Sequence, residues 1–407
     1  MDSLKENPEG NIRIYLPRVL YELMEKNDKK RSGIMVPIEK LVMMLSEKII
    51  IENPDYIIKA YANDNDKENL KNKIIEILDS GGYYHSGGRK ELINRIFDFM
   101  FGYGALQKYI DNGDISDIDG TSYNEFSITK NGIRQEIEIN FGDEKTFDTY
   151  CRLVAVRSGG FLNDDDTHCR TTDLKRKLRI NVSIPPRNIS GPAISIRKHR
   201  NHAYTYEELE QLGMLDEDSR RILETAAPTE KSILFCGKGA AGKTTILRTF
   251  INSLPELERV LVVESDAEIY PDKKYTIEQK TKKPGEGGRP VDLEMLIKDG
   301  LTMSLDTYCI GEIVGPEAYS FIKASCTGHR MLWTIHSSGA GEALDRLVSL
   351  ASGGMTNDSI ERVMEASAAG INLIVYLKKF VVISIFAIRG ISGGQPEYEY
   401  LYERSTK

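Results

Sequence analysis

Residues 237–244 read GKGAAGKT, and the apolar run 233–236 comes directly before them. The stretch 246–250 has apolar residues at helical spacing, so the pattern predicts a strand, a glycine-rich turn and a helix in succession. Glycines let the backbone turn tightly enough for its N–H groups and the helix N-terminus to converge on a phosphate. The spacing therefore predicts a phosphate-binding loop of the Walker A type.

Two residues of this loop carry the chemistry of a bound nucleotide. Lys243 supplies a point charge for the outer phosphates, and Thr244 supplies a hydroxyl ligand to the Mg²⁺ that accompanies them. The alternative reading, a structural glycine-rich turn, leaves Lys243 unexplained. The residues predicted to bind the nucleotide here are Gly237, Gly239, Ala240, Ala241, Gly242, Lys243, Thr244 and Thr245.

Hydrolysis of a bound nucleotide needs carboxylates at neighbouring strand ends, to hold Mg²⁺ through water and to activate the attacking water. One apolar run, 260–263, ends directly in the acid-rich segment that contains Glu264 and Glu268. A second run, 308–310, ends in Gly followed by Glu312. Solvated strand ends are the other reading of these acids. Beside a phosphate-binding loop, we predict that Glu264, Glu268 and Glu312 are catalytic.

A histidine stands on each side of the apolar run 330–335. His336 follows this predicted strand, at the end where parallel sheets bind ligands, and is predicted to sense the γ-phosphate. His329 precedes the run and is a second catalytic candidate, with a structural role as its alternative. A metal site is not favoured, because no cysteine or acid lies at ligand spacing from the two histidines.

The whole chain sets wider limits. Its 407 residues suggest two or three domains, and a net charge of −7 with mixed signs argues against a protein that mainly coats nucleic acid or anionic lipid. The five cysteines have no zinc spacing and are expected to be thiols of a reducing cytoplasm. Since no apolar window is long enough to cross a bilayer, any membrane role is expected to need a partner.

The patterning divides the chain into four parts. Residues 1–90 have apolar positions at helical spacing and are predicted to form a helical region. Residues 91–200 mix helices with short extended runs, including a hairpin at 130–132, and are predicted to be an α+β domain. Residues 201–215 are polar and are expected to be a linker. In residues 216–407 strands and helices alternate, which predicts a parallel sheet with helices on both faces.

Four motifs in a fixed order resemble the type II and type IV secretion-system ATPases. The Walker A loop, the acidic "Asp box", the Walker B strand and the "His box" of that family are similar to residues 237–244, 264–268, 305–312 and 327–336. Three further runs are similar to the tight-adherence (Flp) pilus branch of the family, which is CpaF-like. They are FGYGALQKYIDNGDISDIDG at 101–120, LRINVSIPP at 178–186 and GPAISIRKH at 191–199.

The resemblance implies an α/β protein with a C-terminal RecA-like P-loop NTPase domain, preceded by an α+β (PAS-like) N-terminal domain and a helical region. It also implies a homo-hexamer that binds ATP and Mg²⁺ between the two domains, with Arg179 and Arg197 reaching the phosphates. The expected partner is an inner-membrane platform protein of a pilus or secretion machine, contacted from the cytoplasmic side. Nucleic acid is not the expected partner, because the chain is acid-rich and has no basic stripe interleaved with aromatics.

The chain departs from the family where the family places arginines near the Walker B strand. Thr302, Ser304 and Val314 stand at those positions. Arginine is well suited to stabilise charge on a transferring phosphoryl group. Because these arginines are missing, slow hydrolysis of ATP is a second hypothesis, next to that of a motor with fast hydrolysis. An ATP-binding assembly scaffold with weak or no hydrolysis is therefore the alternative function. The cations nearby in sequence that are available to compensate are Arg289, Lys298 and Arg346.

Overall fold

The computed structural model describes residues 37–63, 65–81, 88–160, 162–163, 165–282, 289–355 and 357–404. The described residues begin with the helices α2 (Ile38–Glu52), α3 (Pro54–Ala62), α4 (Asp66–Gly81) and α5 (Arg89–Phe101). Their apolar faces share one hydrophobic core with the first sheet. The predicted helical spacing is thus confirmed over these helices, whereas residues 1–36, 64 and 82–87 of the predicted helical region lie outside the described residues.

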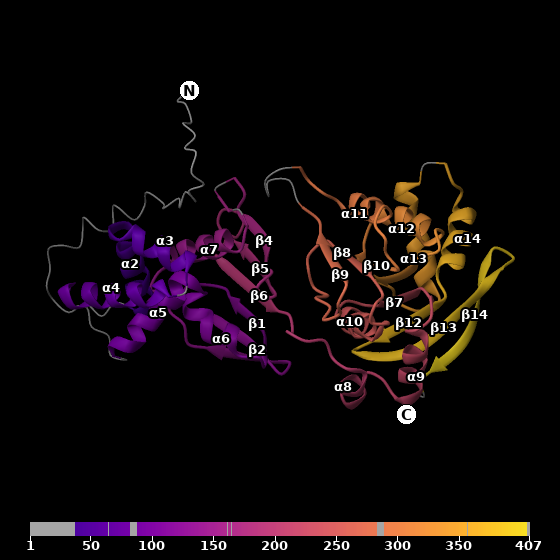
Figure 1. Ribbon diagram of the computed structural model, residues 1–407, viewed down its shortest axis with the longest axis horizontal. Coiled ribbons are helices and arrows are strands. Elements are labelled where there is room, and N and C mark those ends of the chain that lie inside the picture. The colour runs from indigo at the N-terminus through magenta and orange to yellow at the C-terminus, as the bar shows by residue number, and fades with distance from the viewer. Residues whose placement is uncertain are drawn as a thin grey trace, which may run out of the picture. The chain divides into compact units, whose positions relative to one another are not determined.

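An antiparallel sheet follows these helices (Figure 1). Within the described residues its strand order is β3-β2-β1-β6-β5-β4. The bounds are β1 (Ile115–Gly120), β2 (Phe126–Lys130), β3 (Ile133–Ile137), β4 (His168–Asp173), β5 (Leu178–Ser183) and β6 (Ala193–Lys198), with η1 (Gly104–Leu106), α6 (Gln107–Asp111) and α7 (Glu144–Arg157) beside them. The predicted hairpin is confirmed, because Asn131 and Gly132 have φ values of 50° and 77°, as a tight two-residue turn requires.

The two faces of this first sheet differ in character. Ile118, Ile180 and Ile196 are fully buried in the core that the sheet shares with α7. Because side chains alternate along a strand, the intervening residues point to the opposite face. The registers of β1 with β6, of β6 with β5 and of β5 with β4 place a set of charged side chains together on this second face. They include Asp117, Arg170, Arg179 and Arg197.

The segment predicted as a linker contains a short helix, α8 (Tyr206–Gln211). Thr205 begins it with a capping box, in which its side chain and that of Glu208 each accept a hydrogen bond from the other residue's backbone N–H. This Thr-x-x-Glu signature is visible in the sequence and signals a helix start. The next helix, α9 (Glu217–Ala226), begins after Asp216, whose side chain caps it.

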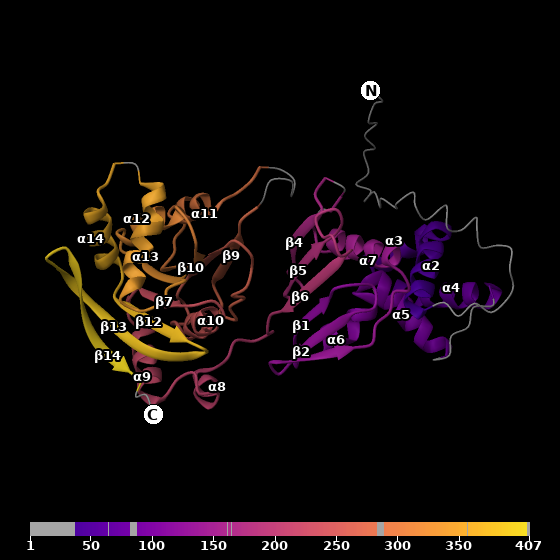
Figure 2. The ribbon, with the colours of Figure 1, turned by 180° about the vertical axis from the view of Figure 1, so that it is seen from behind.

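A second, mostly parallel sheet organises the rest of the chain. Within the described residues its order is β14-β13-β12-β7-β11-β10-β8-β9. The bounds are β7 (Ile233–Gly237), β8 (Val260–Glu264), β9 (Thr276–Lys280), β10 (Thr307–Ile313), β11 (Arg330–Ile335), β12 (Leu373–Lys378), β13 (Val381–Ser392) and β14 (Gln395–Glu403). The predicted parallel sheet is confirmed from β12 to β9, and the long antiparallel hairpin β13–β14 extends one edge (Figure 2).

Helices cover both faces of the second sheet (Figure 1). One face packs against α11 (Leu293–Gly300), α12 (Glu317–Ser325), α13 (Glu342–Ala351), which ends in η2 (Ser352–Gly354), and α14 (Ile360–Gly370). The other face packs against α8, α9 and α10 (Lys243–Ser253). A strand buried on both faces reads as a continuous apolar run, which explains the sequence of β7. The carboxyl ends of these parallel strands meet at one edge, where ligands of such sheets bind.

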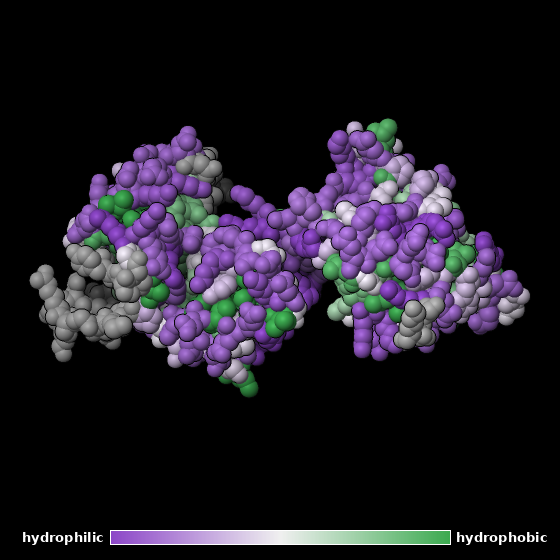
Figure 3. Space-filling model, turned by 90° about the horizontal axis from the view of Figure 1, so that it is seen from below, coloured by the Kyte–Doolittle hydropathy of each residue, from purple (hydrophilic) through white to green (hydrophobic). Residues whose placement is uncertain are grey.

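The surface of the protein has few exposed apolar areas on the face that can be seen in Figure 3. On the face drawn in Figure 3 it is predominantly hydrophilic, and the apolar side chains form small separate groups. In the part of the chain that the structure describes, no helix has the length and apolar character needed to cross a membrane.

Candidate nucleotide-binding site

The loop between β7 and α10 is held in a shape that glycine makes possible. Gly242 has a φ of 94°, and a Cβ at this position would lie 2.6 Å from Cε of Met214. At Gly237, with a φ of 152°, a Cβ would clash with the carbonyl oxygen of Leu377. Ala240 has a φ of 58°, which is uncommon for a residue with a Cβ. The loop thus bends sharply into the N-terminus of α10, as an anion-binding loop does.

Lys243, the first residue of α10, is a buried cation with neutral partners. Its side chain is only 7% exposed overall, and its Nζ donates to the carbonyl oxygens of Gly237 and Lys238 at 3.2 Å. Burial lowers the pKa of Lys243, although Glu312 nearby partly opposes this shift. A buried positive charge held by carbonyl groups at a cavity wall fits an anionic ligand such as a phosphate.

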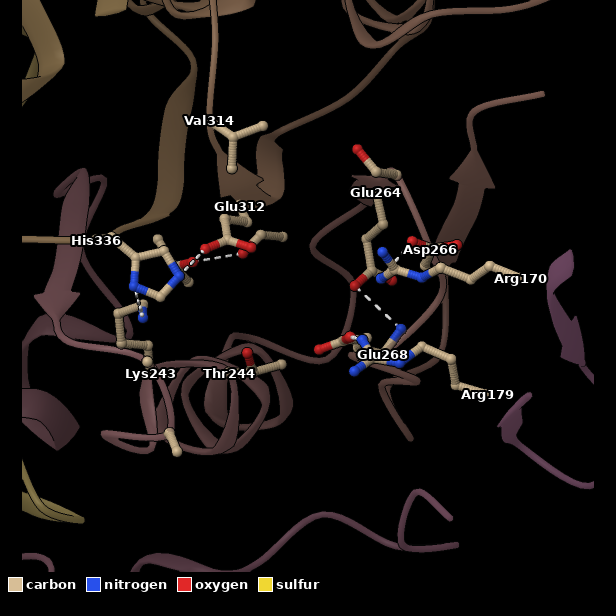
Figure 4. A pocket seen from close by; sticks show the side chains of 15 residues that line it. Arg170, Arg179, Lys243, Thr244, Glu264, Asp266, Glu268, Glu312, Val314 and His336 are labelled. Carbon is tan, nitrogen blue, oxygen red and sulfur yellow. Dashed lines mark hydrogen bonds and ion pairs between the residues drawn. The ribbon is translucent and has the colours of Figure 1, made fainter. Parts of the chain in front are cut away.

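A cavity of about 380 Å³ opens above this loop (Figure 4). Its lining combines the loop, the carboxyl ends of β8, β10 and β11, and two arginines of the first sheet. The lining residues are Arg170, Arg179, Gly239, Ala240, Lys243, Thr244, Glu264, Ser265, Asp266, Glu268, Gly311, Glu312, Val314, Thr334 and His336. Loop, acids, histidine and arginines, which lie far apart in the sequence, therefore share one cavity.

Glu264 ends β8 and lies in the wall of the cavity, with only 5% of its surface exposed. Its carboxyl accepts hydrogen bonds from the backbone N–H groups of Glu268 and Ile269 at 3.2 Å. Burial raises the pKa of Glu264 to about 8, despite the opposing effect of the Ile269 N–H. At neutral pH the Glu264 carboxyl is therefore mostly protonated, and a protonated carboxyl cannot act as a general base.

This buried acid should make folding stability depend on pH. A carboxyl whose pKa rises from 4.5 to about 8 on folding binds more protons in the folded than in the unfolded chain between these values. The free energy of unfolding should then fall as pH rises through this window, by up to about 1.4 kcal/mol per pH unit. Glu264→Gln keeps the shape without the proton, so its stability relative to wild type should increase from pH 5 to pH 8. Urea unfolding at both pH values checks this, and a pH-independent difference would contradict it.

Glu312 lies near the end of β10 and pairs with Nε2 of His336 (Figure 4). The other ring nitrogen of His336, Nδ1, lies 3.4 Å from Nζ of Lys243. Because an ammonium group can only donate, Nδ1 acts as the acceptor and the ring proton sits on Nε2, facing Glu312. His336 thereby links the lysine of the loop to the carboxylate of the neighbouring strand, and it orients both.

His329 lies away from this cluster. It precedes β11, which separates it from His336 by roughly 23 Å at the usual rise of a strand. Its Nδ1 makes a hydrogen bond with Oγ1 of Thr327 at 2.8 Å, and its ring packs edge-on against Tyr308. These contacts fit the structural alternative, and His329 does not line the cavity.

The two predicted arginines are placed differently. Arg179 of β5 lines the cavity and forms an ion pair with Glu268. Arg197 of β6 pairs instead with Asp117 at 2.8 Å and is not part of the lining. The cavity contains a second arginine that sequence reasoning missed, Arg170 of β4, which pairs with Asp266 at 2.6 Å.

The remaining predicted residues fall into two groups. Gly239, Ala240 and Thr244 line the cavity, so the Thr244 hydroxyl is available there for a Mg²⁺ ion. The others shape or follow the loop without lining the cavity, and they are Gly237, Ala241, Gly242 and Thr245.

Thr302, Ser304 and Val314, which stand where the family is expected to have arginines, also have defined places in the structure. Thr302 donates to the carbonyl oxygen of Asp299, and the carbonyl oxygen of Ser304 accepts from Arg259, so neither reaches the cavity. Val314 does line it, with 57% of its surface exposed. The proposed compensating cations Arg289, Lys298 and Arg346 are not in the lining, where the positive charges come from Lys243, Arg170 and Arg179.

A parallel sheet with a glycine-bent loop leading into a helix, and with acids at the neighbouring strand ends, defines a P-loop nucleotide-binding protein. The family model described as "Type II/IV secretion system protein" matches residues 163–373, just over half of the chain. The chain belongs to this family. The resemblance to type II and type IV secretion-system proteins seen in the sequence is thus confirmed at the level of the family.

Two individual relatives of the chain have sequence identities below 30%. A Mycobacterium tuberculosis protein assigned provisionally to conjugal transfer is 26% identical over 245 residues, which are 58% of this chain and 69% of that protein. The type IV secretion system protein VirB11 of Bartonella quintana is 27% identical over 224 residues, 52% of this chain and 61% of that protein. Among solved structures, the ATPase DotB of Legionella pneumophila aligns with 75% of this chain and 80% of its own, at 16% identity and a TM-score of 0.47.

Proposed function

We propose that this chain is a Mg²⁺-dependent ATPase that powers pilus assembly or protein secretion. In this proposal it works as a homo-hexamer on the cytoplasmic side of the membrane, where it acts on an inner-membrane platform protein. Within the family we assign it to the tight-adherence (Flp) pilus, CpaF-like branch. The observation that carries the proposal is the cavity that joins Lys243, the Glu312–His336 pair and two arginines from the first sheet.

The chain's own residues divide the work of hydrolysis between them. The loop N–H groups and Lys243 hold the outer phosphates, and the Thr244 hydroxyl is a ligand for Mg²⁺, whose charge stabilises the phosphates. Glu312 accepts the proton of the attacking water, while His336 fixes the orientation of its carboxylate. Glu264 and Glu268 complete the acidic wall. Arg170 and Arg179 supply the positive charge that the family places near the Walker B strand.

We propose that the chain is divided into a helical region (1–90), an N-terminal domain (91–200), a linker (201–215) and an ATPase domain (216–407). The polar face of the first sheet supports a nucleotide held between the N-terminal and ATPase domains, because this face supplies Arg170 and Arg179 to the cavity.

One observation favours the scaffold as a second candidate. Val314 places an apolar side chain in the cavity lining, where the family is expected to have an arginine. If Arg170 and Arg179 do not replace that charge, the chain would bind ATP and assemble without splitting it.

Phosphate release from ATP and Mg²⁺ by the purified full chain tests the proposal. We expect turnover, and a hexamer in size measurements with a non-hydrolysable ATP analogue. Because arginine contacts to a transferring phosphoryl group contribute strongly, Arg170→Ala and Arg179→Ala should each lower the rate about tenfold or more. The matched control Arg197→Ala removes the same charge from outside the cavity and should stay within about twofold.

The possible results separate the two candidates. Tight binding and ring formation with no phosphate release, even with the membrane partner present, would favour the scaffold. No ATP binding at all would refute both functions. Equal losses in the Arg197 and Arg170 variants would show that the arginines act through net charge and not through contact with phosphate.

A further inference from the structure

One segment between β8 and β9, residues 265–272, contacts the first sheet and the linker through four of its side chains. We call this segment the strap. Ala267 and Ile269 point into the protein and are buried. The side chains that make the contacts are those of Asp266, Glu268, Tyr270 and Asp272.

At the cavity end, the strap neutralises the two arginines. Asp266 pairs with Arg170, and Glu268 pairs with Arg179, and all four side chains line the cavity (Figure 4). The two arginines repel each other, since the pKa of Arg179 is lowered first by burial and then by the positive charges of Arg170 and Arg197. The strap carboxylates balance these charges inside the cavity, so a phosphate that uses the same guanidinium groups must compete with them.

At the linker end, the strap makes contacts outside the cavity. Asp272 accepts a hydrogen bond from the backbone N–H of Ala203 at 2.7 Å. Arg248 of α10, which lies 3.6 Å from Asp272, donates to the carbonyl oxygens of Arg200 and Asn201 at 2.9 and 3.0 Å. None of these residues lines the cavity. A ligand in the cavity therefore competes with the first end of the strap and leaves the second intact.

We propose that the strap is an autoinhibitory contact, in which Asp266 and Glu268 occupy Arg170 and Arg179 until the phosphates of a nucleotide displace them. This inference rests on the proposed function, because it requires a nucleotide in the cavity. A polyphosphate carries more negative charge than two carboxylates and matches the guanidinium geometry equally well, so it wins the exchange. The exchange frees the cavity end of the strap, and the first sheet then stays attached through the linker end.

The test measures affinity for a non-hydrolysable ATP analogue by calorimetry with the full chain. EDTA is present, so that loss of a carboxylate cannot act through Mg²⁺. The double variant Asp266→Asn/Glu268→Gln should bind the analogue about tenfold tighter than wild type, since the arginines no longer have to be released. Each single variant should bind with intermediate affinity, which keeps the test available if the double variant does not fold.

Two controls separate this contact from a general change of charge. Asp272→Asn removes one carboxylate from the linker end of the same strap and should alter the affinity by less than about twofold. Asp266→Glu keeps the charge and should keep wild-type affinity. Unchanged or weaker binding by the double variant would overturn the autoinhibitory contact, and so would equal tightening by Asp272→Asn. If neither wild type nor any variant binds the analogue, either in EDTA or with Mg²⁺ added back, the proposed function fails with it.

Discussion

Lys243→Ala should lower the affinity for nucleotide about a hundredfold or more. The reason is that Lys243 carries a buried positive charge in the cavity wall next to the glycine-rich loop, where the phosphates are proposed to bind. Its Nζ is held by the carbonyl oxygens of Gly237 and Lys238 and lies near His336, so it is already positioned for an anion. Binding of a fluorescent ATP analogue to the variant and to wild type measures the loss.

The same loop offers a matched control. Lys238 is five residues earlier, carries the same charge and is exposed outside the cavity lining. Lys238→Ala should therefore bind the analogue within about twofold of wild type, as expected for an exposed charge. If Lys243→Ala binds as well as Lys238→Ala, the glycine-rich loop is a structural turn and the nucleotide assignment is wrong.

Glu312→Gln should separate binding from hydrolysis. A general base contributes about a hundredfold to ten-thousandfold in rate, so phosphate release should fall within this range. Glutamine keeps the size of the side chain and can still accept the Nε2–H of His336, which should leave ATP affinity within a few fold. Single-turnover release of phosphate and equilibrium binding, measured on the same preparation, give the two numbers.

The control is an exposed glutamate elsewhere on the second sheet, Glu397 of β14. Glu397→Gln makes the same chemical change and should leave the rate unaltered. A Glu312→Gln protein that still turns over at the wild-type rate would remove Glu312 from catalysis. Glu264 would not be its obvious replacement, because burial raises the pKa of Glu264 to about 8.

The phosphate-binding loop and the strand ends could be predicted because their signals are local. Glycine positions fix the loop, and a run such as Val260–Val263 that ends in Glu264 marks a buried strand by itself. Once the sheet is parallel, the carboxyl ends of its strands must meet at one edge. That rule also explains why His336, which follows its strand, reaches the cavity while His329, which precedes it, does not.

The arginines could not be predicted fully because their placement is not local. Arg179 and Arg197 are directly paired on the same face of the first sheet, so no alternation pattern distinguishes them. What distinguishes them is which strand lies against the strap, and residues 265–272 are about ninety positions away in sequence from Arg179 and Arg170. The strand that carries Arg170 reads His-Cys-Arg-Thr-Thr-Asp and has too few apolar residues to stand out.

Hydrogen bonds on both sides of His199 and Arg200 limit the backbone rotation that is possible between the two sheets. On one side, Lys198 is fixed by the carbonyl oxygens of Tyr109 and Asn112, and the N–H of His199 donates to the carbonyl oxygen of Lys177. On the other side, the carbonyl groups of Arg200 and Asn201 are fixed by Arg248. Lys177, on the side of the first sheet, also donates to the carbonyl oxygen of Asn201 at 2.7 Å, so a rotation about the backbone dihedrals between His199 and Arg200 would have to break this bond.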